Sequence, residues 1–476
     1  MNALAGAYHR VIMDVIGDYD LCHCLMKGIT MITRLGTFWE RLRENFWFLP
    51  AIMILIAIAL SVLIVGFDQR ISLQQGETLH WIGTISPEGA RSFLSTVAGS
   101  MISVAGVTFS ITLVALAQTS SQYGPRLTSN FLRDRGNQIV LGTFVATFVY
   151  CILVLRTIRG TEELAFVPHI AVLVGVVLTV ASVGVFVYFI HHISTSLKAE
   201  NIIADIGHEL DRAIARLFPE ESSLEAYEHE LRDEHDIPDN FEEQAIAIKA
   251  SQSGYVQAID YDHLEETAVE NDLLLQLSCR AGNFIAKGDI IVRAWSDEQI
   301  DDDLTKSIGK AFITGSRRLQ SQDIEYAIYQ LVEVAVRSLS PSVNDPFTAV
   351  ACIDQISASL AELAERKIPE GYYYDEAEKL RLVRDAITFT GILEAAFNKI
   401  RRYGRSNVDV VIRLLEALAI IAVRVHTSEQ KEAVITQAHM IRRASEDNIP
   451  EPNDLEAIEA RYRLVLNALE TESQPD

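Results

Sequence analysis

The sequence predicts an α-helical membrane protein in which four transmembrane helices are followed by a cytoplasmic α+β region. Two observations carry this prediction. Four long apolar stretches lie near residues 47–67, 92–118, 138–156 and 166–191, and about 20 apolar residues are enough for a helix to cross a bilayer. Residues 1–198 hold 13 Lys and Arg against 11 Asp and Glu, whereas the rest of the chain holds 28 against 53. We therefore expect a membrane domain over residues 46–198 and an acidic soluble part after it.

The second apolar stretch carries a stripe of small and hydroxylated side chains. No charged residue lies between Ser92 and Ala117. Small residues recur there at steps of three and four, which place them on one helix face: Ser92, Thr96, Gly99, Ser103, Gly106 and Ser110. Such a face lets helices pack closely, because small side chains allow their backbones to approach. It could equally line a water-filled path with hydroxyl groups. In an oligomer, both interpretations can be true at once. On the other faces of the helix, we expect Leu94, Val97 and Met101 to meet lipid or bulkier neighbours.

The other spans contain few polar groups. Gly142 lies one turn from Ala146 in the third span, and the fourth span has small residues at Ala171, Gly175 and Thr179. Asp, Glu, Lys and Arg are absent from the interior of all four spans. Because pumps and ion-coupled carriers normally need ionisable groups within the membrane, this composition favours a passive function.

Loop charges predict the orientation. The flanks expected inside hold more Lys and Arg than the flanks expected outside, so both termini, with the N-terminal segment 1–45, should lie in the cytoplasm. The net charge of −25 after residue 198 argues against binding to nucleic acid.

The soluble region begins with a helix and an acidic linker over residues 199–243, and the helix is expected to continue the fourth span. Alternating strands follow over residues 244–297. There, Gly254-Tyr255-Val256 and the AGNFIAKGD segment at 281–289 resemble the barrel-sandwich pattern of biotinyl and lipoyl carrier domains. Residues 260–271 predict a helix where those carriers present a modified lysine, and Lys287 lies in a different turn. We therefore expect this fold without a cofactor.

Residues 298–476 predict a helical domain. Two apolar helices are separated by a turn with two prolines, which contains Ser340, Asn344, Asp345 and Pro346. Asn344 and Asp345 suit the capping of the helix that starts at Pro346, although they could also bind a ligand. Val410 to Val425 is apolar but contains three charged residues, which indicates a core helix and no further span.

Motifs of catalysis and metal binding are missing. The five cysteines are scattered, so they imply no disulfide framework, and Cys22-His23-Cys24 has no second ligand pair nearby. The sequence has no HExxH or GxSxG motif, and Gly309-Lys310 lacks the first glycine of a phosphate-binding loop. We expect no enzyme, no cofactor and no metal site, unless Asn344 and Asp345 meet Arg317 or Asp323 in space.

The chain after about residue 40 resembles a bacterial family of predicted multi-pass membrane proteins, domain of unknown function 2254. The resemblance is carried by the striped span with its flank (residues 90–138) and by four later blocks: GYVQAID, AGNFIAKGD, SQDIEYA and SLSPSVNDPFTA. It implies four spans in the bacterial inner membrane and a cytoplasmic domain, but no established activity. The stripe and the uncharged span interiors favour a homo-oligomeric passive channel with a cytoplasmic regulatory domain. The alternative is a membrane-tethered sensor or scaffold whose cytoplasmic helices bind a partner protein.

Overall fold

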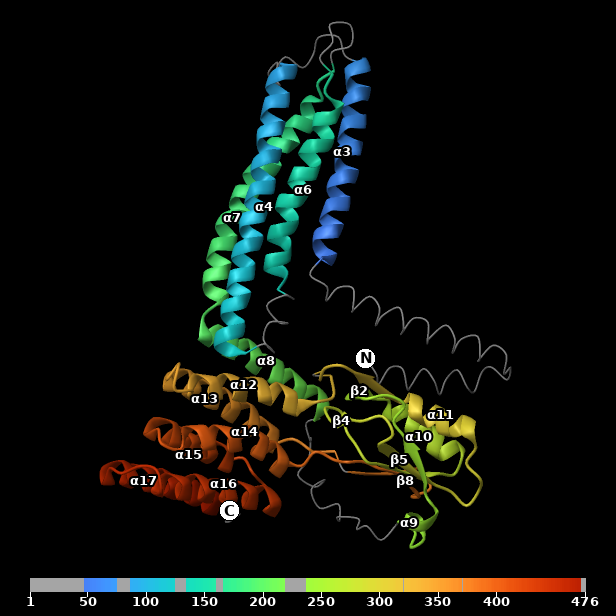
Figure 1. The fold of residues 1–476 in the computed structure, drawn as a ribbon, viewed down its shortest axis with the longest axis vertical. Coiled ribbons are helices and arrows are strands. Elements are labelled where there is room, and N and C mark those ends of the chain that lie inside the picture. Colours follow the sequence, from blue (N-terminus) through green and yellow to red (C-terminus); the bar gives the residue numbers. More distant parts are fainter. Residues whose placement is uncertain are drawn as a thin grey trace. The chain divides into compact units, whose positions relative to one another are not determined.

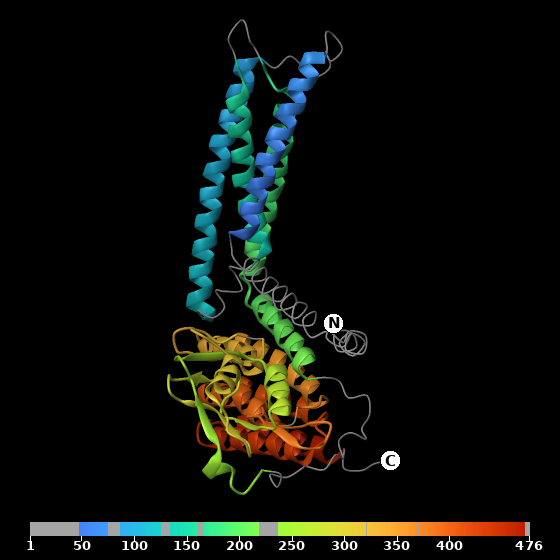
Figure 2. The ribbon, with the colours of Figure 1, turned by 90° about the vertical axis from the view of Figure 1, so that its right-hand side faces the viewer.

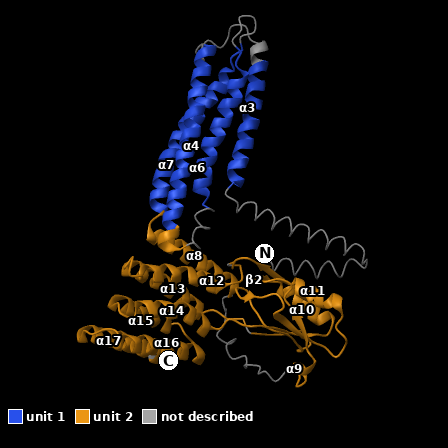
Figure 3. Cartoon of the chain, in the orientation of Figure 1, with its two compact units in different colours: residues 1–119, 127–196 blue, residues 120–126, 197–476 orange. Residues whose placement is uncertain are grey.

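The computed structural model describes residues 47–74, 86–124, 134–159, 166–218, 237–319, 321–369 and 371–471. They form two compact units, shown in different colours in Figure 3. The first unit comprises the chain up to Thr119 together with Leu127–Ser196, and the second comprises Ser120–Arg126 and Leu197–Asp476. The predicted N-terminal segment 1–45, including Cys22-His23-Cys24, lies outside the described residues, as does the acidic linker over residues 219–236.

The first unit is a bundle of four helices (Figures 1 and 2): α3 (Phe48–Gln74), α4 (Pro87–Tyr123), α6 (Arg135–Thr157) and α7 (His169–Ser196). Each contains or closely follows one predicted span, and α3, α4 and α7 extend five or more residues beyond it. All four are long and apolar enough to cross a membrane, and so is α13 (Pro346–Ala364) of the second unit. The described residues therefore contain five helices long and apolar enough to span a membrane, one more than the four spans that the sequence predicted.

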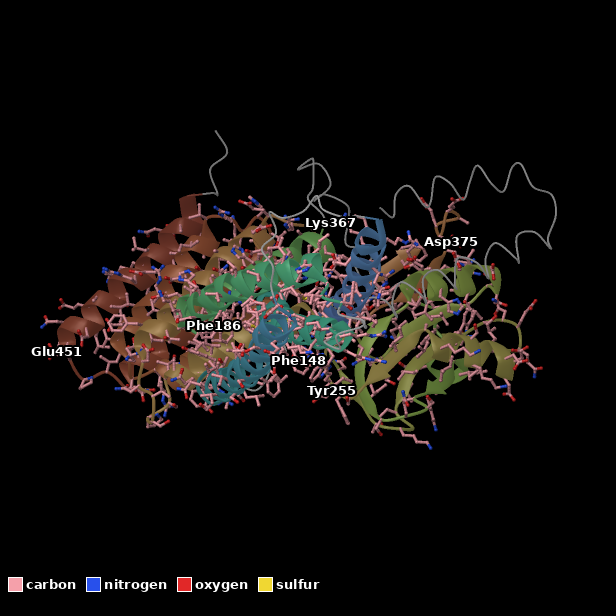
Figure 4. The ribbon with its side chains drawn as sticks, turned by 90° about the horizontal axis from the view of Figure 1, so that it is seen from above. Phe148, Phe186, Tyr255, Lys367, Asp375 and Glu451 are labelled. Atoms are coloured by element: carbon pink, nitrogen blue, oxygen red, sulfur yellow. The ribbon has the colours of Figure 1, made fainter. Side chains whose placement is uncertain are left out.

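Helix α6 forms the centre of the bundle, because it packs closely against both α3 and α7. A Cβ atom at Gly142 would lie 2.5 Å from the sulfur of Met53 and 3.2 Å from the backbone of Pro50, so only glycine permits this approach of α3. Towards α7, Tyr150 donates a hydrogen bond to the carbonyl of Ala171 at 2.9 Å. Phe186 of α7, labelled in Figure 4, extends the aromatic packing of this core.

The fourth span does not continue into the next helix, which corrects the prediction. Helix α7 ends at Ser196, and Lys198 is extended (φ −72°, ψ 133°) before α8 (Ala199–Leu217) begins. The two helices differ in pattern, because α7 is apolar on all sides whereas α8 buries only one face, including Ile206 and Leu210. A break in the backbone lets each helix bury its own apolar surface.

The second unit contains two sheets and several short helices. One sheet has the order β1 (Ile246–Lys249), β5 (Ile290–Trp295), β3 (Leu274–Leu277), β8 (Leu380–Val383) and β7 (Tyr372–Tyr374), and the other has the order β4 (Phe284–Ile285), β2 (Gly254–Ile259) and β6 (Phe312–Gly315). Only the β3–β8 pair is parallel. Helix α9 (Phe241–Gln244) precedes the sheets, α10 (Tyr261–Glu270) occupies the helix predicted at 260–271, and α11 (Asp302–Lys310) precedes β6.

Three strands lie where the sequence predicted only helices. Strand β6 pairs with β2, and the β7–β8 hairpin completes the larger sheet through β3. In the hairpin turn, Asp375 (Figure 4) accepts hydrogen bonds from the backbone N–H of Lys379 at 3.0 Å and from Nε of Arg381 at 2.7 Å. These bonds lower the pKa of the Asp375 carboxyl. The expectation of an all-helical region after residue 298 is wrong here, because β6 and β8 are specified by partners more than 50 residues away and β7 pairs only with β8.

The remaining helices form a stack of antiparallel pairs (Figure 1): α12 (Ile324–Ser338) with α13, α14 (Phe389–Gly404) with α15 (Val408–Ala422), and α16 (Ser428–Glu446) with α17 (Pro452–Thr471). Helix α8 packs on α12 and α13. Helix α15 contains much of the apolar segment that was predicted to be a core helix, and Leu414, Leu415 and Leu418 are fully buried in the stack.

Candidate functional site

The stripe on α4 lies on the surface of the first unit. All six of its residues are exposed: Ser92, Thr96, Gly99, Ser103, Gly106 and Ser110. No described atom lies within 4 Å of the position that a Cβ would take at Gly99 or Gly106, apart from the helix's own local backbone. The hydroxyls of Ser103 and Ser110 donate to the carbonyls of Gly99 and Gly106, both at 2.9 Å. Within this chain, the stripe therefore contacts no described helix.

A different face of α4 packs against the bundle. Leu94 is fully buried and reaches to within 3.3 Å of the Cβ position at Gly175 of α7, and Val97 and Met101 are also buried. The side chain of Arg91 donates to the carbonyl of Ile158 at 3.0 Å. Of the two alternatives predicted for Leu94, Val97 and Met101, lipid or bulkier neighbours, the structure shows the second, because all three are buried within the chain. Helix α4 thus has one face that packs against its own bundle and one face that no other described helix covers.

Charged groups of the bundle lie near the helix ends. Asp68 is 7% exposed and accepts the backbone N–H groups of Ile170 at 3.3 Å and Ala171 at 3.0 Å. It thereby satisfies the first turn of α7, where backbone donors have no partner within the helix. Asp134 caps α6 through Gly136 N at 2.8 Å and lies 2.5 Å from Nε2 of His192. In the described parts of the four helices, Asp, Glu, Lys and Arg occur only within the first or last two turns.

The turn between α12 and α13 has a clear structural task. Asp345 accepts the backbone N–H of Thr348 at 3.2 Å and its hydroxyl at 2.6 Å, which caps α13. Asn344 adopts a positive φ of 50°, and its backbone N–H donates to the carbonyl of Ser340 at 2.8 Å. Pro346 occupies the first turn of α13, where a missing N–H costs little. Among the described residues, no hydrogen bond or ion pair joins Asn344 or Asp345 to Arg317 or Asp323.

The second unit contains a charged cleft that the sequence did not reveal. It has a volume of about 250 Å³ and lies where the end of α8, the start of α10 and several sheet loops meet. Its lining combines the apolar side chains of Phe218, Ile368 and Ile387 with the charged side chains of Arg280, Arg384 and Asp385. Apolar lining with a few polar groups is the common form of a small-ligand site.

Both arginines of the cleft are held by carboxylates. Arg280 Nη2 donates to Glu325 at 2.6 Å, and its Nη1 lies 3.5 Å from Asp385. Arg384 pairs with Glu265 and stacks its guanidinium 4.4 Å from the ring centroid of Tyr261. Nε of Arg384 is buried without a hydrogen-bond partner among the described residues. The contacts with Glu265 and Tyr261 therefore fix the orientation of the Arg384 guanidinium.

Burial shifts the titration of the groups beside Arg384. Burial raises the pKa of the Glu265 carboxyl, although Arg384 opposes this effect. Burial also raises the pKa of the Tyr261 hydroxyl, and Arg384 again opposes it. Both shifts arise because charged forms are disfavoured away from water. Tyr261 thus remains a neutral hydroxyl at physiological pH.

A second ion-pair cluster is connected to the cleft through Glu325, which binds Arg280 and lies 3.6 Å from Arg318. Arg318 binds the 2% exposed carboxylate of Asp323 through Nε at 2.6 Å and Nη2 at 2.7 Å, and Asp323 also caps α12. Gly282 has a φ of +95°, and a Cβ there would lie 2.3 Å from the same carboxylate. Nearby, the side chain of Gln322 joins the backbone of Ile259 through bonds of 2.8 and 2.9 Å.

The cleft lining thus includes Ala281 of the AGNFIAKGD segment and Gln322 of the SQDIEYA segment, and Gln322 bonds the backbone of Ile259 in the GYVQAID segment. Sequence reasoning missed Arg280 and Arg384, since their partners lie 45 to 119 residues away. The described residues contain no group of three His, Cys, Asp or Glu side chains that could hold a metal ion.

Comparisons with known proteins identify the kind of chain but not its activity. A family model described as "Predicted membrane protein (DUF2254)" matches residues 43–420. Uncharacterised proteins of Mycobacterium bovis and Mycobacterium tuberculosis are each 28% identical over 437 residues, which cover 90% of this chain and 81% of theirs. No solved structure matches the chain significantly.

Proposed function

Because the chain belongs to the DUF2254 family of predicted membrane proteins, we propose that it is a subunit of a homo-oligomeric passive channel with a cytoplasmic regulatory domain. Its membrane part would consist of α3, α4, α6 and α7. Helix α13 is the remaining apolar candidate, but it packs against α8, α12 and α15 in the second unit, and its Ser359 donates to Asp211 of α8 at 2.5 Å. These contacts favour a core helix and four spans.

One observation supports the proposal of an oligomer: the small-residue face of α4 is exposed in the described part of the single chain. Gly99 and Ser103 are four residues apart, as are Gly106 and Ser110, and both pairs fit the small-xxx-small pattern of closely packed membrane helices. The same helix uses another face for its own bundle, so the partner of the stripe would come from a second copy. A ring of such copies would turn the hydroxyls towards the neighbouring subunit or a central path.

The distribution of charge supports passive conduction. The middle turns of α3, α4, α6 and α7 carry no Asp, Glu, Lys or Arg, and Asp68 is engaged in capping α7. A coupled transporter would need ionisable groups along its path, whereas hydroxyl and backbone dipoles can line a passive one. The excess of Lys and Arg on one set of flanks supports cytoplasmic termini in the inner membrane of a bacterium.

Paired size and conductance measurements test this proposal. We expect Gly99→Leu and Gly106→Leu to reduce the mass of the purified assembly in mild detergent, since a bulky side chain prevents close contact. Gly184→Leu on α7 is the matched control, because no described atom lies within 4 Å of its Cβ position either. Planar-bilayer recordings should show current with the wild type and the control, and less with the α4 variants. An unchanged mass for both α4 variants would exclude the stripe as the interface.

The charged cleft supports a second candidate, a membrane-tethered sensor. Its fixed arginines and apolar lining suit a small organic anion, and such a ligand would make the second unit a detector in its own right. Arg384→Met should abolish stabilisation of the full-length protein by candidate carboxylates and phosphates, while the assembly mass stays unchanged. Conductance without any ligand response would favour the channel alone.

A further inference from the structure

We propose that an open groove between α12 and α14 binds the phosphate headgroup of an anionic membrane lipid. The groove has a volume of about 560 Å³. Val332 and Val336 of α12 contribute apolar lining, and Arg337, Lys399 and Arg402 bring positive charge from both helices. This inference concerns a lipid site outside the charged cleft and does not depend on whether the protein conducts.

The groove is positive within a strongly acidic part of the chain. Three cations line it against one carboxylate, that of Glu333, which lies 3.3 Å from Nε of Arg337. Nζ of Lys399 lies 4.4 Å from the ring centroid of Tyr329, and neither Lys399 nor Arg402 forms an ion pair with any described residue. Two cations therefore remain without a protein counter-ion, although residues 199–476 contain 53 acidic groups.

Two further arginines, Arg401 and Arg443, lie near the groove residue Arg402. Burial and the neighbouring Arg402 and Arg443 lower the pKa of Arg401, and its Nε is buried without a hydrogen-bond partner among the described residues. Like charges in proximity disfavour one another, so an anion bound beside Arg402 would be stabilising. The local charge thus selects for a negatively charged ligand.

Chain connectivity points to the membrane as the source of that anion. Gly124 belongs to the same compact unit as the groove, and a Cβ there would lie 2.6 Å from Oε1 of Glu333 and 3.2 Å from Nε of Arg337. Gly124 directly follows α4, the helix that contains the predicted span 92–118. The chain therefore connects the groove-lining face of α12 to the end of a predicted span, and the ends of spans lie in the headgroup region of a bilayer.

The remaining lining suits an interfacial position. Tyr403 borders the groove with 62% of its surface exposed. Tyrosine rings accumulate at the level of lipid headgroups, because they combine an apolar body with a polar tip. Lysine and arginine near anionic lipid each add about 1 kcal/mol of attraction. A phospholipid headgroup would thus meet cations, an aromatic ring and an apolar floor.

The test uses full-length protein in a mild neutral detergent, titrated with dioctanoyl phosphatidylglycerol and followed by native mass spectrometry and thermal unfolding. We expect this lipid to bind and to raise the unfolding midpoint, and dioctanoyl phosphatidylcholine to do neither. Lys399→Gln/Arg402→Gln should weaken binding about 30-fold, since two attractive charges are lost. Lys306→Gln/Lys310→Gln removes two exposed lysines from α11 and should leave binding unchanged.

Three results would overturn the proposal. Equal binding of phosphatidylcholine would show that headgroup charge is irrelevant. An equal effect of glycerol phosphate would identify a site for soluble phosphate instead of lipid. If the double variant binds phosphatidylglycerol with wild-type affinity, the groove is not the lipid-binding site. If that variant fails to fold, Arg402→Gln alone decides the question, because this exposed side chain forms no ion pair with any described residue, and its loss should weaken binding about fivefold.

Discussion

The carboxylate of Asp323 has two separable tasks at the start of α12, and replacing it tests the support of the charged cleft. It is 2% exposed and receives two hydrogen bonds from Arg318, at 2.6 and 2.7 Å. It also accepts the backbone N–H of Tyr326 at 3.1 Å, as the N-cap of the helix. Asp323→Ala removes both functions, whereas Asp323→Asn keeps a capping oxygen and loses the charge.

The expected costs follow from these contacts. Loss of an N-cap costs about 1 kcal/mol, and removing one partner of a buried ion pair costs about 3–5 kcal/mol. Arg318 is 19% exposed and keeps Glu325 at 3.6 Å, so the lower limit applies. We therefore expect about 4 kcal/mol for Asp323→Ala and about 3 kcal/mol for Asp323→Asn.

Hydrogen–deuterium exchange of the full-length protein measures these differences locally, as the free energy of opening of the first turn of α12. Thr388→Ala is the control, since Thr388 caps α14 through Gly391 N at 3.1 Å and has no ion pair; it should cost about 1 kcal/mol in its own helix. If Asp323→Asn differs from the wild type by less than about 1 kcal/mol, the Arg318 pair does not stabilise this region.

Three further predictions concern the bundle, a buried thiol and a hairpin. Gly142→Leu should lower the thermal-unfolding midpoint, at a cost of about 1–3 kcal/mol, because the new side chain overlaps Met53; Gly184→Leu should leave that midpoint nearly unchanged. Burial raises the pKa of Cys279 to about 11, so iodoacetamide at pH 8 should label it in denaturant but not in the native protein, as mass spectrometry can show. The lowered pKa of Asp375 means that its carboxylate stabilises the β7–β8 hairpin above the ordinary Asp pKa of about 4. Amide protection there should fall as the pH drops below about 4 in the wild type and depend less on pH in Asp375→Asn, which keeps only Asp272 as the carboxylate partner of Lys379 and Arg381.

Local patterns in the sequence predicted the helices well. The four apolar stretches, the helix at 260–271 and the last helices of the chain are all present, since each is specified by its own periodicity and caps. Thr427 and Gln430, for example, form a capping box at the start of α16. The stripe on α4 is also a local pattern, and its residues do share one exposed face.

Long-range pairing was hidden from the sequence. Strand β8 is only four residues long and joins the sheet through β3, which lies about 100 residues earlier. The carboxylate partners of Arg280 and Arg384 lie 45 and 119 residues away. Leu94 and Val97 suit lipid and protein equally well, so hydrophobicity alone could not decide which face of α4 its own bundle would cover. Only the three-dimensional arrangement distinguishes the face that packs against the bundle from the exposed one.

The way in which the chain divides between its two units affects how the soluble part can be produced in isolation. A fragment starting at residue 197 omits residues 120–126, which cluster with the same unit. It would uncover the surface of α12 around Glu333 and Arg337 that Gly124 approaches. A better recombinant design grafts residues 120–126 onto the fragment through a flexible glycine–serine linker, so that the excised unit keeps its own complement of segments.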